Sequence, residues 1–175
     1  MKTLHAHLDT KIQGFTLIEL LIVIALLGAL AIGLLATIDP FEQLKKGRDT
    51  STRNTVSEFY NANLRYYSTK SGWPWTAGGI TANLMNAGVN SAIDTLISAG
   101  ELKSGFTGYV GTGALSTIFV ASTGLGDLHV CYMPSSKSFQ LDPNTIYDSA
   151  GTTSITNCKS VVNSSTGNDC YYCIQ

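Results

Sequence analysis

The stretch that decides the fold is KIQGFTLIELLIVIALLGALAIGLLATIDP, residues 11–40. From Leu20 to Ile38 it contains no charged side chain, and as an α-helix this run is about 28 Å long at a rise of about 1.5 Å per residue. The hydrocarbon core of a bilayer is about 30 Å thick. The sequence therefore predicts a membrane-spanning helix with one acid, Glu19, at its start.

Three kinds of N-terminal segment have an apolar run of this sort. A cleaved secretory signal has an apolar core of about 7–15 residues followed by a small-residue cleavage site. Here the core is longer, and the small residues Ala29 and Ala31 lie within it. A permanent signal anchor accounts for the length but leaves Glu19 unexplained. In the third kind the chain is cut before the apolar run, so that the helix stays on the mature protein.

The third kind accounts for the residues around the start of the run. Gly14 is a small residue at the edge of the apolar block, and Lys2 and Lys11 favour a cytoplasmic position for the residues before it. Cleavage after Gly14 gives Phe15 a free amine, which is largely protonated at neutral pH. Glu19 then lies one helical turn away, where the helix N-terminus favours a carboxylate and where an ammonium of the same or an adjacent helix can pair with it.

The sequence GFTLIELLIVIALLGALAIGL, residues 14–34, resembles the class III signal of type IV pilins and of the related pseudopilins of type II secretion. In those proteins the leader is cut after a glycine, the new N-terminal phenylalanine is methylated, and the fifth mature residue is glutamate. Gly14, Phe15 and Glu19 match these positions one for one. The resemblance implies cleavage between Gly14 and Phe15, N-methylation of Phe15 and a role for Glu19 in assembly.

The resemblance implies a structural filament subunit and not an enzyme. The subunit is held in the lipid bilayer as a single-pass membrane protein, cut by prepilin peptidase, and drawn by an inner-membrane assembly platform into an extracellular helical filament with copies of itself. There Glu19 neutralises a neighbour's N-terminal amine and sets the axial register. The filament is expected to be a type IV pilus serving adhesion, motility or DNA uptake. The alternatives are a pseudopilin of a type II secretion system and a membrane-anchored domain whose leader stays uncut.

Small residues recur along the predicted membrane helix. Ala25, Ala29 and Gly33 are spaced four apart and so lie on one helix face. Small residues at this spacing let helix backbones approach closely in lipid. We therefore expect this face to pack against neighbouring helices.

A second helix is predicted after the apolar run. Asp39, Pro40 and Glu42 form a helix-start pattern, with Pro40 at the first helical position and a kink expected there. Apolar residues then recur every three or four positions to about Ser68, as in an amphipathic helix. The sequence YYSTKSGWPW ends this helix, and Trp73 and Trp75 are more readily explained as core or loop anchors than as adhesive aromatics.

Further along the chain the periodicity changes. One or two short helices are expected within residues 80–103, the second capped at Asn90 or Ser91 and stopped by Gly100. Strands are expected in LSTIFVAS (115–122), LHVCYM (128–133), SFQL (138–141) and CYYCI (170–174), with PSSK (134–137) as a hairpin turn and a long surface loop between Asp142 and Asp169.

These elements predict an α+β type IV pilin fold, with a long N-terminal helix packed on a roughly four-stranded antiparallel sheet. The expected division of the chain is a leader at 1–14, the long helix at 15–70 with its membrane part at 15–38, and a globular head at 71–175.

The four cysteines, Cys131, Cys158, Cys170 and Cys173, all lie in the last third of the chain. Their even number after a membrane segment favours disulfides outside the cytoplasm, and the single Cys-x-x-Cys makes a structural zinc site less favoured. In an extended strand the Cα atoms of Cys170 and Cys173 lie about 10 Å apart, too far for a disulfide unless the chain turns there. We favour Cys158–Cys170 with Cys131–Cys173.

Other kinds of chemistry have little support. With 11 basic and 12 acidic residues and no basic cluster in the head, nucleic-acid binding by the lone subunit is not expected. His5 and His7 fall in the leader and His129 stands alone, so no catalytic residue, metal site or cofactor is expected. Two weak alternatives stay open: a calcium site from acidic loop residues, and a glycosylation sequon at Asn163. The acidic residues in question are Asp142, Asp148 and Asp169.

Overall fold

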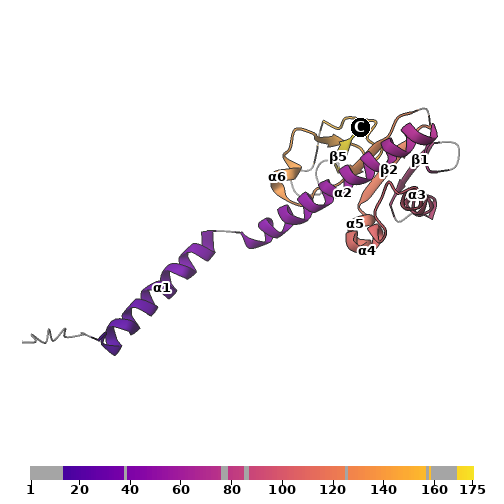
Figure 1. Cartoon of the computed structure of the whole chain (residues 1–175). Helices are drawn as coiled ribbons and strands as arrows, with labels where there is room; N and C mark the ends of the chain where they lie inside the picture. The colour runs from indigo at the N-terminus through magenta and orange to yellow at the C-terminus, as the bar shows by residue number, and fades with distance from the viewer. Residues whose placement is uncertain are drawn as a thin grey trace, which may run out of the picture. The chain divides into compact units, whose positions relative to one another are not determined.

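The computed structural model describes residues 14–37, 39–75, 79–84, 87–124, 126–156, 158 and 169–175. Lys2, Lys11, His5, His7 and Asn163 therefore lie outside the described residues. The chain divides into two compact units, Met1–Pro40 and Phe41–Gln175, and we call the second the head. The elements are drawn in Figure 1 and run in the order α1 (Leu17–Thr37), α2 (Pro40–Lys70), β1 (Ile80–Asn83), α3 (Ala87–Ser98), α4 (Phe106–Val110), α5 (Thr112–Leu115), β2 (Ile118–Ser122), β3 (His129–Tyr132), α6 (Lys137–Gln140), β4 (Thr145–Tyr147) and β5 (Tyr171–Ile174).

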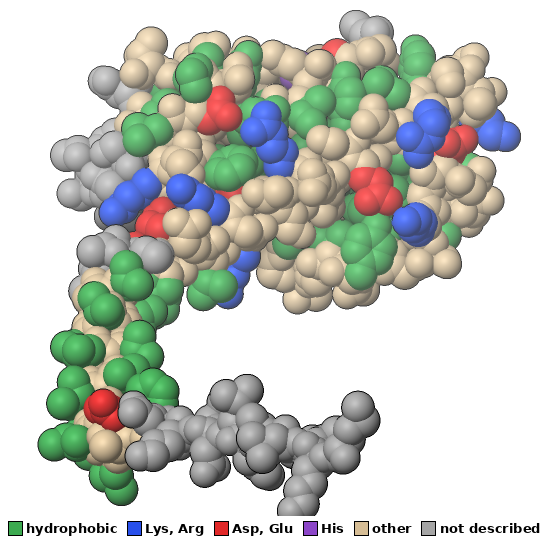
Figure 2. Space-filling view, turned by 60° about the vertical axis from the view of Figure 1, so that its left-hand side comes forward, with side chains coloured by type: hydrophobic (Ala, Val, Ile, Leu, Met, Phe, Trp, Pro, Cys, Tyr) green, Lys and Arg blue, Asp and Glu red, His purple; other side chains and the backbone are tan. Residues whose placement is uncertain are grey.

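The first unit contains α1, a helix of 21 residues. Its described side chains are exposed on every side, and hydrophobic side chains cover the face of this helix that is visible in Figure 2. The span Leu17–Leu35 has a mean hydropathy of 2.8 and is long and apolar enough to cross a membrane. The helix α1 ends at Thr37 and α2 begins at Pro40, and the kink expected at Pro40 stays a prediction. Proline fits this place because the first helical residue needs no N–H donor.

The second helix, α2, belongs to the head apart from its first residue and has one buried face. Val56, Phe59 and Ala62 recur at intervals of three and are fully buried. The helix runs to Lys70, two residues beyond the predicted end, and Ser71 then takes a left-handed conformation with φ 55°. Ser71 N–H donates to Tyr67 O at 2.8 Å, which closes the last turn.

The sheet has five strands in the order β1-β2-β3-β5-β4, and every neighbouring pair is antiparallel. The predicted strands within 115–122, 128–133 and 170–174 are confirmed as β2, β3 and β5. Two strands were not predicted. β1 falls where a helix was expected, and β4 falls within the segment expected to be a surface loop. Both are edge strands of three or four residues, held in place by pairing with β2 and β5.

The core of the head lies between α2 and the sheet and extends to α3, α4 and α5. Phe59 from α2, Ile93 and Leu96 from α3, and Ile118 and Val130 from the sheet belong to one cluster of buried residues. Figure 1 shows α2 lying across the sheet, with α3, α4 and α5 along one side of the helix and α6 on the other. The α+β architecture expected from the sequence is therefore present.

The prediction of a strand at SFQL was wrong, because residues 137–140 form the short helix α6. Asp49 on α2, only 4 % exposed, fixes the start of this segment. Ser135 and Ser136 each donate a backbone N–H and a hydroxyl to its carboxylate, at 2.6–3.1 Å. Glu42 accepts the next N–H, that of Lys137, at 3.0 Å. The segment is thus held by two carboxylates of α2 instead of by a neighbouring strand.

Two disulfides join the described cysteines. Cys131 on β3 is bonded to Cys173, its direct cross-strand neighbour on β5, and Cys158 is bonded to Cys170. This is the pairing favoured from the sequence. The first disulfide closes a separation of 42 residues and the second a separation of 12. Together they tie the segment after β4 and the strand β5 to the body of the sheet.

Candidate functional site at the start of the apolar helix

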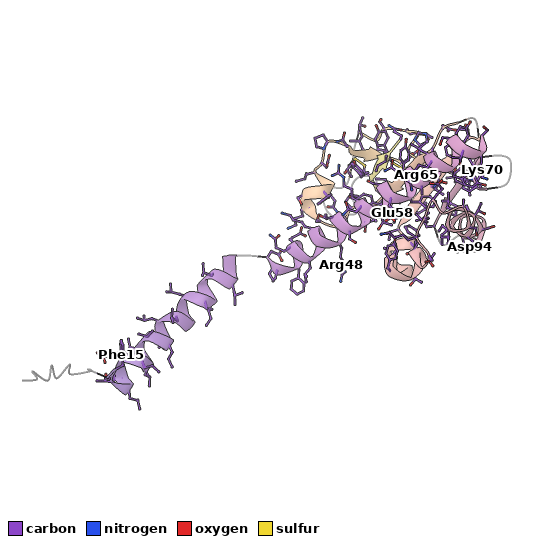
Figure 3. The ribbon with its side chains drawn as sticks, viewed as in Figure 1. Phe15, Arg48, Glu58, Arg65, Lys70 and Asp94 are labelled. Carbon is purple, nitrogen blue, oxygen red and sulfur yellow. A yellow bond between two sulfur atoms is a disulfide. The ribbon has the colours of Figure 1, made fainter. Side chains whose placement is uncertain are left out.

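The predicted cleavage junction lies immediately before α1. Gly14 and Phe15 are both exposed, Phe15 at 85 %, and Phe15 is labelled in Figure 3. A Cβ atom added to Gly14 meets no atom within 4 Å. Packing within the described chain therefore does not require glycine at this position.

Glu19 has a partner that sequence reasoning did not identify. Thr16 donates both its backbone N–H and its hydroxyl to Glu19 Oε2, at 2.8 and 2.7 Å. In return, Glu19 N–H donates to Thr16 Oγ1 at 3.3 Å. This reciprocal arrangement is a capping box, in which Thr16 is the N-cap of α1 and Glu19 the third helical residue. The spacing Thr-x-x-Glu before an apolar run was the signal from which it could have been predicted.

The capping box answers part of the question that Glu19 raises. The first turn of a helix has backbone N–H groups without intrahelical partners, and the helix dipole favours a negative charge there. Glu19 meets both requirements, since its carboxylate accepts the N–H of Thr16 and places a negative charge in the first turn. The acid is therefore held in a defined position at the end of a helix that is otherwise apolar.

The small residues predicted to pack against other helices lie on α1 and are exposed. Ala25, Ala29 and Gly33 face no other part of the described chain, and a Cβ added to Gly33 meets nothing within 4 Å. This face therefore has room for a close neighbour. Contact with another helix stays a prediction.

The remaining candidate residues lie in the head. His129 on β3 has its Nε2 3.9 Å from Asp127 Oδ2. The rings of Trp73 and Trp75 stack on each other with their centroids 5.3 Å apart, and both pack against the hydrophobic core, as expected for anchors. Asp142 lies 3.7 Å from Arg53. Among the residues that the structure describes, no group of three or more His, Cys, Asp or Glu is placed to hold a metal ion.

Asp148, another of the acidic loop residues, lies in a turn. Asp148 accepts the N–H of Thr152 at 3.0 Å. Burial pushes the pKa of Asp148 up, but bonds from Thr152 and Thr153 outweigh it and leave the pKa below its usual value. Asp148 thus has a local structural role at the turn after β4.

Comparison with protein families gives one match, the prokaryotic N-terminal methylation motif, over residues 9–35. Neither the curated proteins nor the solved structures gave a match to the chain. The matched residues include Gly14, Phe15, Thr16 and Glu19 and nearly all of α1. Proteins with this motif are structural and not enzymatic. The chain therefore carries the class III signal peptide of type IV pilins, followed by an apolar helix long enough to span a membrane.

Proposed function

We propose that this chain is the precursor of a type IV pilus subunit, cut after Gly14 by prepilin peptidase and N-methylated on Phe15. The observation that carries the proposal is the order of features along the start of the chain. An exposed Gly-Phe junction is followed at once by the Thr16–Glu19 capping box and then by an apolar helix with no partner in the described chain. In this proposal residues 1–14 are the leader, residues 15–70 form the assembly helix and residues 71–175 form the head.

The charge of Glu19 gives the helix a reason to assemble. A carboxylate within hydrocarbon is costly unless an opposite charge accompanies it. Cleavage after Gly14 creates an ammonium on Phe15, four residues before Glu19. In a bundle of such helices the ammonium of one subunit can neutralise the Glu19 of its neighbour. Because only one axial offset brings the two groups together, the pair also sets the register.

Close packing of α1 against other copies supplies further assembly energy. Before assembly lipid covers this surface, and the subunit is a single-pass membrane protein docked at the inner-membrane assembly platform. In the extracellular filament the helices of other copies replace lipid, with Ala25, Ala29 and Gly33 at the closest approach. No part of this scheme needs a cofactor or a catalytic residue in the subunit.

A pseudopilin of a type II secretion system is the second candidate, because its precursor carries the same N-terminal motif. The two disulfides of the head favour the pilus subunit, since disulfides stabilise a domain that is exposed outside the cell. The major pseudopilins usually lack such bonds. Adhesion, motility and DNA uptake are all activities of an assembled surface filament.

The test is the mass and the N-terminal sequence of the protein sheared from cells. We expect a chain that begins at Phe15 and is heavier by about 14 Da, the mass of one methyl group. A chain that still begins at Met1 and stays in the membrane fraction contradicts the proposal. Loss of exported enzymes with unchanged surface fibres, on deletion of the gene, selects the pseudopilin instead.

Glu19→Gln separates cleavage from assembly. We expect this variant to be cut after Gly14 but to form few filaments, because the amide keeps the shape of the side chain and removes its charge. Asp94→Asn is the matched control, since Asp94 is an exposed acid on α3 of the head. Filaments at the normal level from Glu19→Gln contradict the role assigned to Glu19.

A further inference from the structure

The head has a groove along one flank of α2. A hollow of about 500 Å³ lies between α2, α5 and the chain just after β3, and a smaller one of about 200 Å³ continues it toward α4. The two share Ser51, Thr52, Val110 and Ala114, so they form one channel. Its walls are mostly small, apolar or hydroxyl-bearing side chains, so an apolar side chain can enter it without a steric clash.

The two ends of the groove carry opposite charges. Arg48 lines one end and Glu58 the other, and Figure 3 labels both on α2. Asp49 also lines the Arg48 end, but it is only 4 % exposed and its carboxylate accepts from Ser135 and Ser136. At a rise of about 1.5 Å per residue they are about 15 Å apart along the helix axis. Tyr109 donates to Glu58 at 3.3 Å and so holds this carboxylate at the rim. A ligand that fills the groove is therefore expected to be apolar in the middle and charged at both ends.

The head also carries an exposed apolar side chain with charges on both sides. Leu141, directly after α6, is 70 % exposed, the highest exposure among the aliphatic side chains described in the head. Lys137 precedes it by four residues and Asp142 follows it. Leu141 N–H donates to Lys137 O at 3.1 Å, so the three residues belong to one compact turn. Asp49 fixes the start of that turn through Ser136.

The exposed leucine and the groove lie on opposite flanks of α2. Arg53 reaches Asp142 on the α6 side, whereas Arg48, Thr52 and Glu58 line the groove on the α5 and α4 side. Figure 1 shows α6 on one side of α2 and α4 and α5 on the other. When Leu141 of one copy contacts the groove of a second copy, the groove of the first copy and the Leu141 of the second remain available for further copies. Such a head-to-tail contact repeats into an open helical chain when its rotation does not close into a ring.

We propose that Leu141 of one subunit docks in the α2 groove of a second copy of this chain, with Lys137 facing Glu58 of that copy. Asp142, which lies 3.7 Å from Arg53 of its own chain, then also faces Arg48 of the second copy. The charges fit in one orientation only, which gives the contact a direction. The inference rests on the proposed filament function and adds the contact between heads to the contact between apolar helices.

Cysteine cross-linking of the full-length chain in cells tests the docking. Leu141→Cys and Ala114→Cys are placed together in one chain, and sheared filaments are separated on a non-reducing denaturing gel. Because each copy then contributes one cysteine to each of two contacts, we expect a ladder of covalent oligomers. Either substitution alone gives no ladder. Leu141→Cys with Ser98→Cys is the control, since Ser98 is exposed at the end of α3 and lies outside the groove.

Charge exchange gives a second test that does not depend on new cysteines. Glu58→Lys alone and Lys137→Glu alone each place like charges at the contact, and we expect each to lower the yield of filaments about tenfold. The double variant restores the opposite pair and should restore the yield. Normal filaments from both single variants, or no recovery in the double variant, overturn the proposal.

The outcomes separate this inference from the function on which it rests. If the unmodified chain assembles and the cysteine chain stays monomeric within its filaments, the docking is wrong and the filament function stands. If the unmodified chain keeps its leader and forms no filament, both are wrong.

Discussion

The two long helices α1 and α2 have the same secondary structure and opposite surroundings. Every described side chain of α1 is exposed, including Leu26 at 61 % and Leu27 at 59 %. On α2, by contrast, Val56, Phe59 and other residues of one face are fully buried. Both helices contain apolar side chains, but only α2 has them confined to one side with a sheet to cover them.

The difference shows where each helix finds its stabilising partner. A helix that is apolar on one face can complete its packing within its own domain, whereas one that is apolar all round needs lipid or other helices. α2 therefore belongs to the fold of the head. α1 needs a partner outside the head, which in the proposed function is first the bilayer and then the filament.

The largest contrast should come from removing a large apolar side chain in each helix. We expect Phe59→Ala to lower the free energy of unfolding of the head by about 3–5 kcal/mol, because it leaves a cavity in the core. Leu27→Ala should change it by less than about 0.5 kcal/mol. Denaturation of the full chain in detergent, followed by the fluorescence of Trp73 and Trp75, measures both. Equal losses would mean that α1 packs on the head.

An added positive charge should have the larger effect on α1 and the smaller effect on α2. Leu27→Arg places a cation in the middle of α1 and should weaken membrane insertion by about 2.5–3.5 kcal/mol. Asn61→Arg, at an exposed position of α2, should change the stability of the head by less than about 0.5 kcal/mol. The share of Leu27→Arg in the membrane fraction measures insertion, and Asn61→Arg should leave that share unchanged; unfolding of Asn61→Arg measures the stability of its head. If Leu27→Arg inserts normally, α1 is not surrounded by lipid.

The polar side of α2 can be tested at Asp49. Asp49→Ala leaves the N–H and hydroxyl groups of Ser135 and Ser136 without their acceptor, and we expect a loss of about 2 kcal/mol in the stability of the head. Asp94→Ala removes an exposed carboxylate of the same size and should have little effect. The two variants are compared by thermal unfolding. A similar small effect from both would show that α6 is not held through Asp49.

The smallest effect should be a dependence on acid at Glu42. The N–H of Lys137, and then the side chain of Lys45, hold the pKa of Glu42 below its ordinary value. A lowered pKa contributes stability that is fully present above the ordinary value of about 4.3 and is lost as the pH falls through the lower value of the folded protein. The free energy of unfolding of the head should therefore fall less between neutral and strongly acidic pH in Glu42→Gln than in the unmodified chain. An unchanged acid profile would contradict this.

The elements that follow a strong local pattern were predicted well. The continuous apolar run gave α1, the three-and-four periodicity gave α2, and the β-branched and aromatic runs gave β2, β3 and β5. Gly14, Phe15 and Glu19 could be recognised because the N-terminal methylation motif that matches residues 9–35 has particular residues at fixed spacing. In each case the information lies within a few neighbouring residues.

The elements that were missed depend on distant partners. The alternating SFQL looks like a strand, but Asp49 and Glu42, far away in sequence, hold its start as a helix. β4 has only three residues, and its place in the sheet comes from pairing with β5. The capping role of Thr16 is different, since its signal, Thr-x-x-Glu before an apolar run, lies within four neighbouring residues.

The strand order has a consequence for how the head is made. β4 precedes β5 along the chain, yet it is held in the sheet through β5, which lies between it and β3. When the polypeptide is made from its N-terminus, β1, β2 and β3 can pair as they appear, but β4 must wait until residues 171–174 have followed. The cross-strand bond from Cys131 to Cys173 forms only at that point. Oxidation of this pair therefore marks a head whose sheet has been completed.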